Sequence, residues 1–215
     1  MKNRFDLIIF DWDGTLINSI DWITHCLQHA AAQYDCPIPE SQAAKDVIGL
    51  SINKAMQTLF PEVDEQTQEQ LVGCYSQKYF SKRISRNDLF PGVYEMLVQL
   101  NEEGYQLAVA TGKSRAGLQE ALMATGTEGL FCITRCSDET ASKPDPRMLS
   151  EIIQHTNTAQ ERSLMVGDSI HDLQMAHNAH ISAIAVSCGA HSTEFLQQYN
   201  PLLCLQQPTE LLNII

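Results

Sequence analysis

Short apolar runs recur along much of the chain, with helical patterns between them. Residues 7–10 form a wholly apolar run, which is typical of a strand buried on both faces of a parallel sheet. Comparable runs follow at 107–110, 131–134, 164–166 and 183–186, with weaker units near 202–205 and 209–214. Strands and helices that alternate in this way predict an α/β fold with a doubly wound parallel sheet.

Residues 17–88 follow a different pattern. Apolar side chains recur there at helical spacing, and Gly49 and Pro61 interrupt helical segments that we expect near 19–34, 40–47, 51–60 and 64–81. No run in this segment is typical of a buried strand. We therefore expect an all-helical cap domain at 17–88, inserted into a core domain of residues 1–16 and 89–215.

Composition favours a chain that folds without covalent cross-links. Its 215 residues are enough for a sizeable core, and its seven cysteines are odd in number and scattered, which indicates reduced thiols. The sequence shows no signal-peptide pattern and no apolar run near the ~18 residues of a membrane span. We expect a cytoplasmic protein with no membrane partner.

The charge narrows the choice of ligand. A net charge of −12, with 14 Lys and Arg spread over the chain, argues against a nucleic-acid partner. A small phosphate can still bind to an acidic protein when a lysine or a metal ion supplies a local positive charge.

Polar residues stand where several predicted strands end. Asp11 and Asp13 follow the first run, with Gly14 allowing a sharp turn, and Thr111 and Asp168 follow two others. Each residue alone has a simple structural explanation, as a turn residue or a helix cap. Ligands of open α/β sheets bind at the carboxyl ends of the strands, so the coincidence predicts a site. Clustered carboxylates are costly without a cation, and hard oxygen ligands suit Mg²⁺.

One motif is deceptive. Gly112-Lys113-Ser114 matches the end of a phosphate-binding P-loop. That motif also requires a glycine five residues before Gly112, where this chain has Leu107. We exclude ATP or GTP binding by this route.

The residues around these positions resemble the haloacid dehalogenase superfamily, specifically its phosphoglycolate phosphatase-like branch with a helical cap. The resemblance covers essentially the whole chain and rests on four motifs in order, at residues 11–16 (DWDGTL), 110–113 (ATGK), 142–146 (SKPDP) and 166–172 (VGDSIHD). Asp145 and His180 depart from residues common in the family, His and Gly respectively. Neither position is catalytic, so the departures bear on the substrate.

The resemblance implies a two-step phosphoryl transfer. Asp11 would be the nucleophile that forms an aspartyl-phosphate. Asp13 would protonate the departing alkoxide and then deprotonate the hydrolytic water.

The resemblance also implies the binding groups. Thr111, the backbone N–H groups that follow it from Gly112, and Lys143 would hold the phosphoryl oxygens. Mg²⁺ would be bound by Asp11, Asp168 and the backbone carbonyl of Asp13. Asp172 would orient Lys143 or a metal-bound water.

The expected function is Mg²⁺-dependent hydrolysis of a small phosphate monoester, such as phosphoglycolate or a sugar phosphate. A phosphomutase is the alternative that the core motifs leave open. A phospho-accepting receiver domain is a remote alternative, because it requires adjacent acids where Asp11 and Asp13 are two apart. A carbon–halogen dehalogenase would need neither the metal nor the acid at Asp13.

The loop at residues 48–54 is our expected substrate contact within the cap. Gly49 marks a break between two helices, and Ser51, Asn53 and Lys54 offer hydrogen bonds to a substrate. A simpler role for Ser51 is to cap the helix that follows.

Overall fold

The computed structural model describes residues 4–215, and a parallel sheet in the order β3-β2-β1-β4-β5-β6 runs through it. The strands are β1 (Leu7–Phe10), β2 (Gln106–Thr111), β3 (Ile133–Cys136), β4 (Ser163–Gly167), β5 (Ser182–Val186) and β6 (Cys204–Leu205). This arrangement confirms the predicted α/β fold with a parallel sheet.

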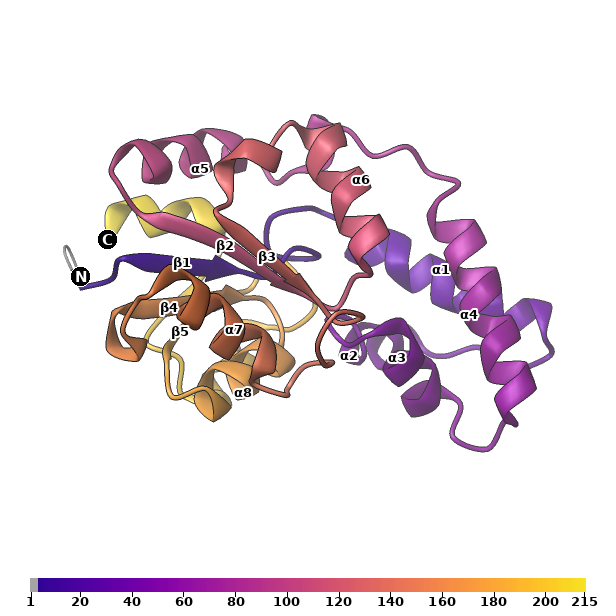
Figure 1. Cartoon of the computed structure of the whole chain (residues 1–215). Helices are drawn as coiled ribbons and strands as arrows, with labels where there is room; N and C mark the ends of the chain where they lie inside the picture. Colours follow the sequence, from indigo (N-terminus) through magenta and orange to yellow (C-terminus); the bar gives the residue numbers. More distant parts are fainter. Residues whose placement is uncertain (1–3) are drawn as a thin grey trace.

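Helices cover both faces of the sheet (Figure 1). One face carries α5 (Val93–Glu102), α6 (Arg115–Thr125) and the C-terminal 3₁₀ helix η5 (Pro208–Asn213), and the other carries α7 (Arg147–Thr156) and α8 (Ile170–Asn178). Ile8 and Phe10 pack into the core on the α5 side, whereas Leu7 and Ile9 pack into the core with α7 and α8. This alternation along β1 explains why the whole run is apolar, since both of its faces are buried.

The segment between β1 and α5 forms a separate helical body. It consists of α1 (Ile20–Gln33), α2 (Ser41–Asp46), α3 (Ile52–Leu59) and α4 (Glu65–Tyr79), which lie beyond the strand ends (Figure 1). Its buried apolar side chains, among them Leu27, Met56 and Leu71, form a hydrophobic cluster that also includes Ala190 of the core and is distinct from the clusters on the two faces of the sheet. None of the helices in residues 4–215 is long and apolar enough to cross a membrane.

The third strand differs from the sequence prediction. We expected it at 131–134, but β3 begins at Ile133 and continues through Thr134 and Arg135. Phe131 instead packs edge-on against Trp12. β3 pairs only with β2, and such an edge strand tolerates polar side chains, so an apolar run is a poor guide to its limits.

The centre of the sheet sets the position of the site. β1 lies between β2 and β4, and the chain reaches these two neighbours by crossovers on opposite faces of the sheet. Such a reversal opens a crevice outside the carboxyl ends of the strands. Asp11, the first residue after β1, stands at this crevice.

Candidate active site

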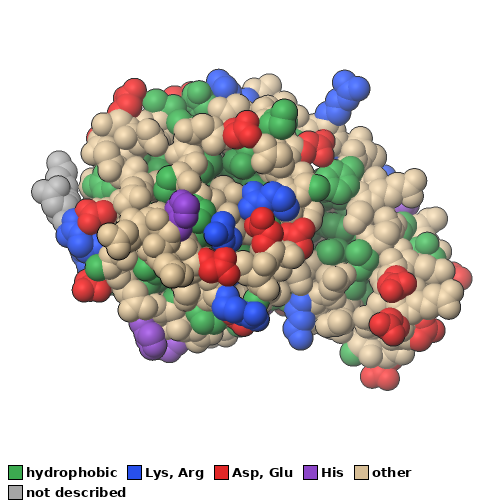
Figure 2. Space-filling model, viewed as in Figure 1, with side chains coloured by type: hydrophobic (Ala, Val, Ile, Leu, Met, Phe, Trp, Pro, Cys, Tyr) green, Lys and Arg blue, Asp and Glu red, His purple; other side chains and the backbone are tan. Residues whose placement is uncertain are grey.

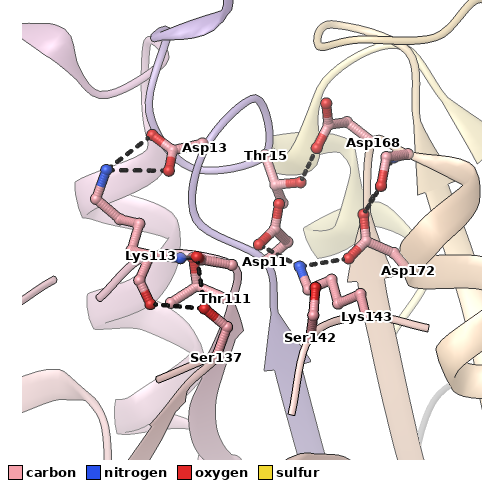
Figure 3. Close-up of polar contacts among 12 residues, drawn as sticks. Asp11, Asp13, Thr15, Thr111, Lys113, Ser137, Ser142, Lys143, Asp168 and Asp172 are labelled. Atoms are coloured by element: carbon pink, nitrogen blue, oxygen red, sulfur yellow. Dashed lines mark hydrogen bonds and ion pairs between the residues drawn. The ribbon is translucent and has the colours of Figure 1, made fainter. Parts of the chain in front are cut away.

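Three strand ends bring polar side chains into one small volume (Figure 3). Asp11 follows β1, Thr111 ends β2 and Asp168 follows β4, and each residue is only 1% exposed. Lys143 enters from the loop after β3, with its side chain fully buried. The structure therefore places side by side the residues that the sequence located at separate strand ends.

Lys143 forms ion pairs with two carboxylates. Its Nζ lies 2.5 Å from Asp11 Oδ1 and 2.7 Å from Asp172 Oδ1. Burial disfavours the ammonium, but the two carboxylates outweigh it and the pKa of Lys143 is raised. Asp172 is fixed in turn, because Ser169 donates from its backbone N and its hydroxyl to Asp172 Oδ2. Asp172 thus lies where it can orient Lys143.

The buried carboxylates outnumber the lysine that neutralises them. Oxygens of Asp11, Asp168 and Asp172 lie within 4.8 Å of one another. Burial, together with the neighbouring carboxylates, raises the pKa of Asp11 well above its usual range although Lys143 opposes the shift, and burial beside Asp172 raises the pKa of Asp168 to about 7. Three ionised carboxylates beside one lysine would carry an excess of negative charge, and the raised pKa values of Asp11 and Asp168 reflect the cost of that excess.

This excess fits a divalent cation. Asp11 Oδ2 is buried and has no hydrogen-bond partner, so one carboxylate oxygen is left for a metal. Asp168 is held rigidly beside it, since Thr15 Oγ1 donates to Asp168 Oδ1 at 2.9 Å and Ala190 N donates to Oδ2 at 2.7 Å. An oxygen-only donor set of this kind suits Mg²⁺.

Gly14 shows how tightly the loop after β1 packs against these carboxylates. It has a φ of +83°, the left-handed conformation expected for the turn. A Cβ at this position would overlap the Asp168 carboxylate. Gly14 therefore serves both the turn and the close approach of the backbone to Asp168.

Asp13 points away from the carboxylate cluster, toward Lys113 (Figure 3). Lys113 Nζ donates to Asp13 Oδ2 at 3.0 Å and to Oδ1 at 3.2 Å, and Ser19 Oγ donates to Oδ1 at 2.7 Å. Lys113 also donates at 2.5 Å to the hydroxyl of Tyr79, from the helical body. The Asp13 side chain is therefore not among the clustered carboxylates, and a metal role would fall to its backbone carbonyl.

The sequence did not single out Lys113. In the sequence this lysine belongs to the 110–113 motif and to the rejected P-loop match, and neither assigns it a role of its own. Burial disfavours its ammonium, but Asp13 and Tyr79 outweigh that effect and the pKa of Lys113 is raised. Its partner Asp13 lies 100 residues away in sequence, so no local pattern could have revealed the pair.

The helical body rests directly on this edge of the core. Ser51 N donates to Ser142 Oγ at 2.8 Å, next to Lys143. His171 Nε2 lies 2.8 Å from the backbone oxygen of Asp46 in α2. Gly112 faces the carbonyl oxygens of residues 49 and 50 so closely that a Cβ there would overlap both.

The three predicted contact residues of the loop lie apart from the cavity. Ser51 Oγ accepts a hydrogen bond from Lys54 N at 3.3 Å, so this side chain caps α3. Asn53 and Lys54 are exposed on α3. A cavity of about 160 Å³ between the helical body and the core is lined instead by neighbouring residues, including Leu50 and Ile52.

The cavity connects the two predicted catalytic carboxylates. Asp11 and Asp13 both line it, and Lys113 does so from the core side. A substrate in this cavity would have its reacting group between Asp11, the candidate nucleophile, and Asp13, the candidate acid. Such a geometry suits transfer of a group from substrate to protein, assisted by a proton donor.

Comparison with known proteins identifies the family. The model of the haloacid dehalogenase-like hydrolases matches residues 8–186. The chain belongs to this family. The resemblance predicted from the four motifs is thereby confirmed.

Relatives of this hydrolase carry different functional names. The pyrophosphatase PpaX of Bacillus cereus is 28% identical over 213 residues, which cover 99% of this chain and 97% of that protein. A predicted phosphoglycolate phosphatase from Haemophilus somnus is 24% identical, with a TM-score of 0.87 over 100% of this chain and 99% of its own. A β-phosphoglucomutase from Clostridium difficile is 15% identical, with a TM-score of 0.84 over 96% of this chain and 93% of its own. Structural likeness at these identities shows the fold alone.

The contact at Gly112 gives a first prediction for this hydrolase. Gly112→Ala would force a methyl group against the carbonyls of residues 49 and 50, and overpacking of this kind costs about 1–3 kcal/mol. We expect kcat/KM to fall about tenfold, the equivalent of roughly 1.4 kcal/mol. Hydrogen exchange at residues 49 and 50 should become faster.

Gly129→Ala is the matched control, because a Cβ there meets nothing within 4 Å. If both variants behave alike, close contact between the helical body and Gly112 is not needed for activity.

Proposed function

We propose that this hydrolase cleaves a small phosphate monoester with the help of Mg²⁺, through an aspartyl-phosphate on Asp11. The observation that carries the proposal is the state of Asp11. It is buried at the carboxyl end of the central strand, Lys143 binds its Oδ1, and its Oδ2 has no partner. A carboxylate held in this way is ready to act as a nucleophile.

Lys143 and the end of β2 would bind the phosphoryl group. Lys143 carries a charge that opposes the repulsion between the Asp11 carboxylate and an incoming phosphate. Thr111 and the backbone N–H of Gly112 would donate to phosphoryl oxygens, and donors fixed in a buried site stabilise the charge that develops there. Thr111 Oγ1 is itself fixed, as it accepts from Lys113 N at 3.2 Å.

Asp11, Asp168 and the backbone carbonyl of Asp13 would hold Mg²⁺. When bound, the ion supplies positive charge that offsets the buried carboxylates and the phosphate. Asp172 stays with Lys143 and keeps that lysine directed at Asp11.

Asp13 would act as the general acid and then the general base. It lies on the cavity side of Asp11 and is held by Ser19 and Lys113, so its orientation does not depend on the substrate. A proton delivered from Asp13 lets the leaving group depart as an alcohol. The same carboxylate can then deprotonate the water that hydrolyses the aspartyl-phosphate.

Residues 17–88 would work as a cap that closes over the core, 1–16 and 89–215. The contacts of Tyr79 with Lys113 and of Ser51 with Ser142 support this role, since they join the helical body to residues beside the site. Closure of such a lid excludes water and completes a site.

The rival functions concern the fate of the phosphoryl group. A phosphomutase would return it from Asp11 to a sugar, whereas a phosphatase gives it to water. Incubation with p-nitrophenyl phosphate and with a panel of sugar phosphates separates them. We expect one inorganic phosphate for each alcohol released, and isomerised sugar phosphate without free phosphate would favour the mutase.

Asp13→Asn tests whether Asp13 is the general acid. We expect kcat to fall about 10²–10⁴-fold on alkyl phosphates, the usual contribution of a general acid. The loss should be smaller on p-nitrophenyl phosphate, whose leaving group needs less protonation. Asp21→Asn is the control, because the Asp21 side chain is 95% exposed. Equal losses on both kinds of ester would contradict the acid role of Asp13.

A further inference from the structure

We infer that the leaving group of the substrate is uncharged and largely apolar, an inference that rests on the proposed phosphatase function. The cavity beside Asp11 and Asp13 is the place that the leaving group would occupy. Its side toward the helical body consists mainly of apolar and aromatic side chains, among them Ile23, Leu27, Leu50, Ile52, Tyr75 and Phe80. Burial of apolar surface against this side would stabilise a complementary leaving group.

Charged groups are scarce in the cavity. Among the described residues that line it, Asp11, Asp13 and Lys113 are the charged ones, so Lys113 is the single cation there. An ammonium has three donor hydrogens. Lys113 directs them at the two oxygens of Asp13 and at the hydroxyl of Tyr79. It has no donor left for an anionic substituent.

The two serine hydroxyls of the lining are also engaged within the protein. Ser76 Oγ donates to the backbone oxygen of Val72 at 2.8 Å. Ser114 Oγ accepts from Gly117 N at 3.3 Å, as the cap of α6. Among the described residues that line the cavity, Tyr75 is left with a side-chain hydroxyl that has no hydrogen-bond partner. The polar surface that remains for a leaving group is therefore small and uncharged.

An anionic leaving group would meet an unfavourable environment. Phosphoglycolate would bring a carboxylate, and pyrophosphate a second phosphate, next to Asp13 and the apolar side of the cavity. A buried charge without a partner costs several kcal/mol. The observations favour an ester of an apolar or aromatic alcohol over both of these substrates, including the one named in the pyrophosphatase relatives.

A pair of substrates with the same shape tests the inference on the unmodified enzyme. Isobutyl phosphate matches phosphoglycolate in outline but has an isopropyl group in place of the carboxylate, with two methyl groups where the two carboxylate oxygens would be. We expect its kcat/KM to exceed that of phosphoglycolate on the order of a hundredfold or more, given the cost of an unpaired buried charge. Pyrophosphate should be as poor as phosphoglycolate.

Two results would overturn the inference in different ways. Phosphoglycolate or pyrophosphate turned over as well as isobutyl phosphate would disprove the uncharged leaving group and leave the phosphatase function intact. No hydrolysis of any ester, p-nitrophenyl phosphate included, would disprove the phosphatase function and the inference with it.

Phe80 allows a test by substitution. It is 46% exposed and lines the cavity. Phe80→Ala therefore removes apolar surface from the cavity lining without creating a void in a hydrophobic core. We expect kcat/KM for benzyl phosphate to fall about tenfold more than for methyl phosphate, which has no apolar body to bury. Tyr34→Ala, which removes another aromatic side chain of the helical body that is 37% exposed and lies outside the cavity lining, should change neither value. Equal losses on both esters in Phe80→Ala would contradict the assigned pocket.

Discussion

Asp11→Asn is expected to abolish turnover while the fold is retained. The substitution keeps the volume of the side chain and removes the carboxylate that would attack phosphorus. Phosphate-monoester hydrolysis is among the slowest uncatalysed reactions, with accelerations that reach about 10²¹-fold, so activity without the nucleophile should be undetectable. The measurement is release of inorganic phosphate from p-nitrophenyl phosphate, with circular dichroism to verify folding.

Asp172→Asn is an informative companion to this variant. Asp172 also contacts Lys143, at 2.7 Å, but would not react with the substrate. We expect partial activity from it, about 10–100-fold below the unmodified enzyme, as is usual for a residue that supports others. More than a few per cent of the original kcat in Asp11→Asn would contradict the assignment of the nucleophile.

Removal of divalent metal is the second change with a large expected effect. A chelator should reduce turnover to background and added Mg²⁺ should restore it, because Lys143 alone does not neutralise Asp11, Asp168 and Asp172. Ca²⁺ should substitute poorly, since it prefers a larger and looser shell of ligands. Full turnover in the presence of the chelator would refute the requirement for a divalent metal.

Thermal unfolding gives a readout of the same site without catalysis. A ligand that binds only the folded state raises Tm, by an amount that increases with the ratio of its concentration to its Kd. Mg²⁺ should therefore raise the Tm of the unmodified protein, and Asp168→Ala should weaken this response. A rise in Tm that Asp168→Ala leaves unchanged would place the metal elsewhere.

The central strands could be predicted from the sequence because their physical environment is uniform. β1 and β4 are buried on both faces, and an apolar run reports this directly. β3 is an edge strand that contains Thr134 and Arg135, so its limits depend on pairing with β2 and not on its own composition.

The residues of the candidate site also differ in how far the sequence could predict them. Asp11, Thr111 and Asp168 could be located because each stands at the end of an apolar run. The pairing of Lys113 with Asp13 and Tyr79 depends on the docking of the helical body, which no local pattern encodes.

The cap loop carries a signal in its sequence that identifies the residues facing the cavity. Ile52 and Ala55 are three residues apart and line the cavity from one side of α3, whereas Asn53 and Lys54 are exposed. Helical spacing therefore indicated the inward residues. The expectation for Ser51, Asn53 and Lys54 rests on their hydrogen-bonding groups, whereas helical geometry sets the direction in which each side chain points.

Surface charge agrees with a small-molecule site. On the face in Figure 2, basic side chains are interspersed with acidic ones, and acidic groups gather at the far end of the helical body. Arg115 pairs with Glu139 and Arg135 with Glu151, so these cations are partly neutralised at the surface. The positive charges that bear on the proposed reaction, Lys113 and Lys143, are buried instead.

The covalent intermediate is the central claim, and it can be measured directly. Acid quenching during turnover of p-nitrophenyl phosphate, followed by digestion and mass spectrometry, should show one phosphoryl group on the peptide that contains Asp11. The signal should be absent from Asp11→Asn and should increase in Asp13→Asn if hydrolysis of the intermediate is slowed more than its formation. Efficient turnover with no phosphorylated peptide, or with the phosphoryl group on a residue other than Asp11, would contradict the account.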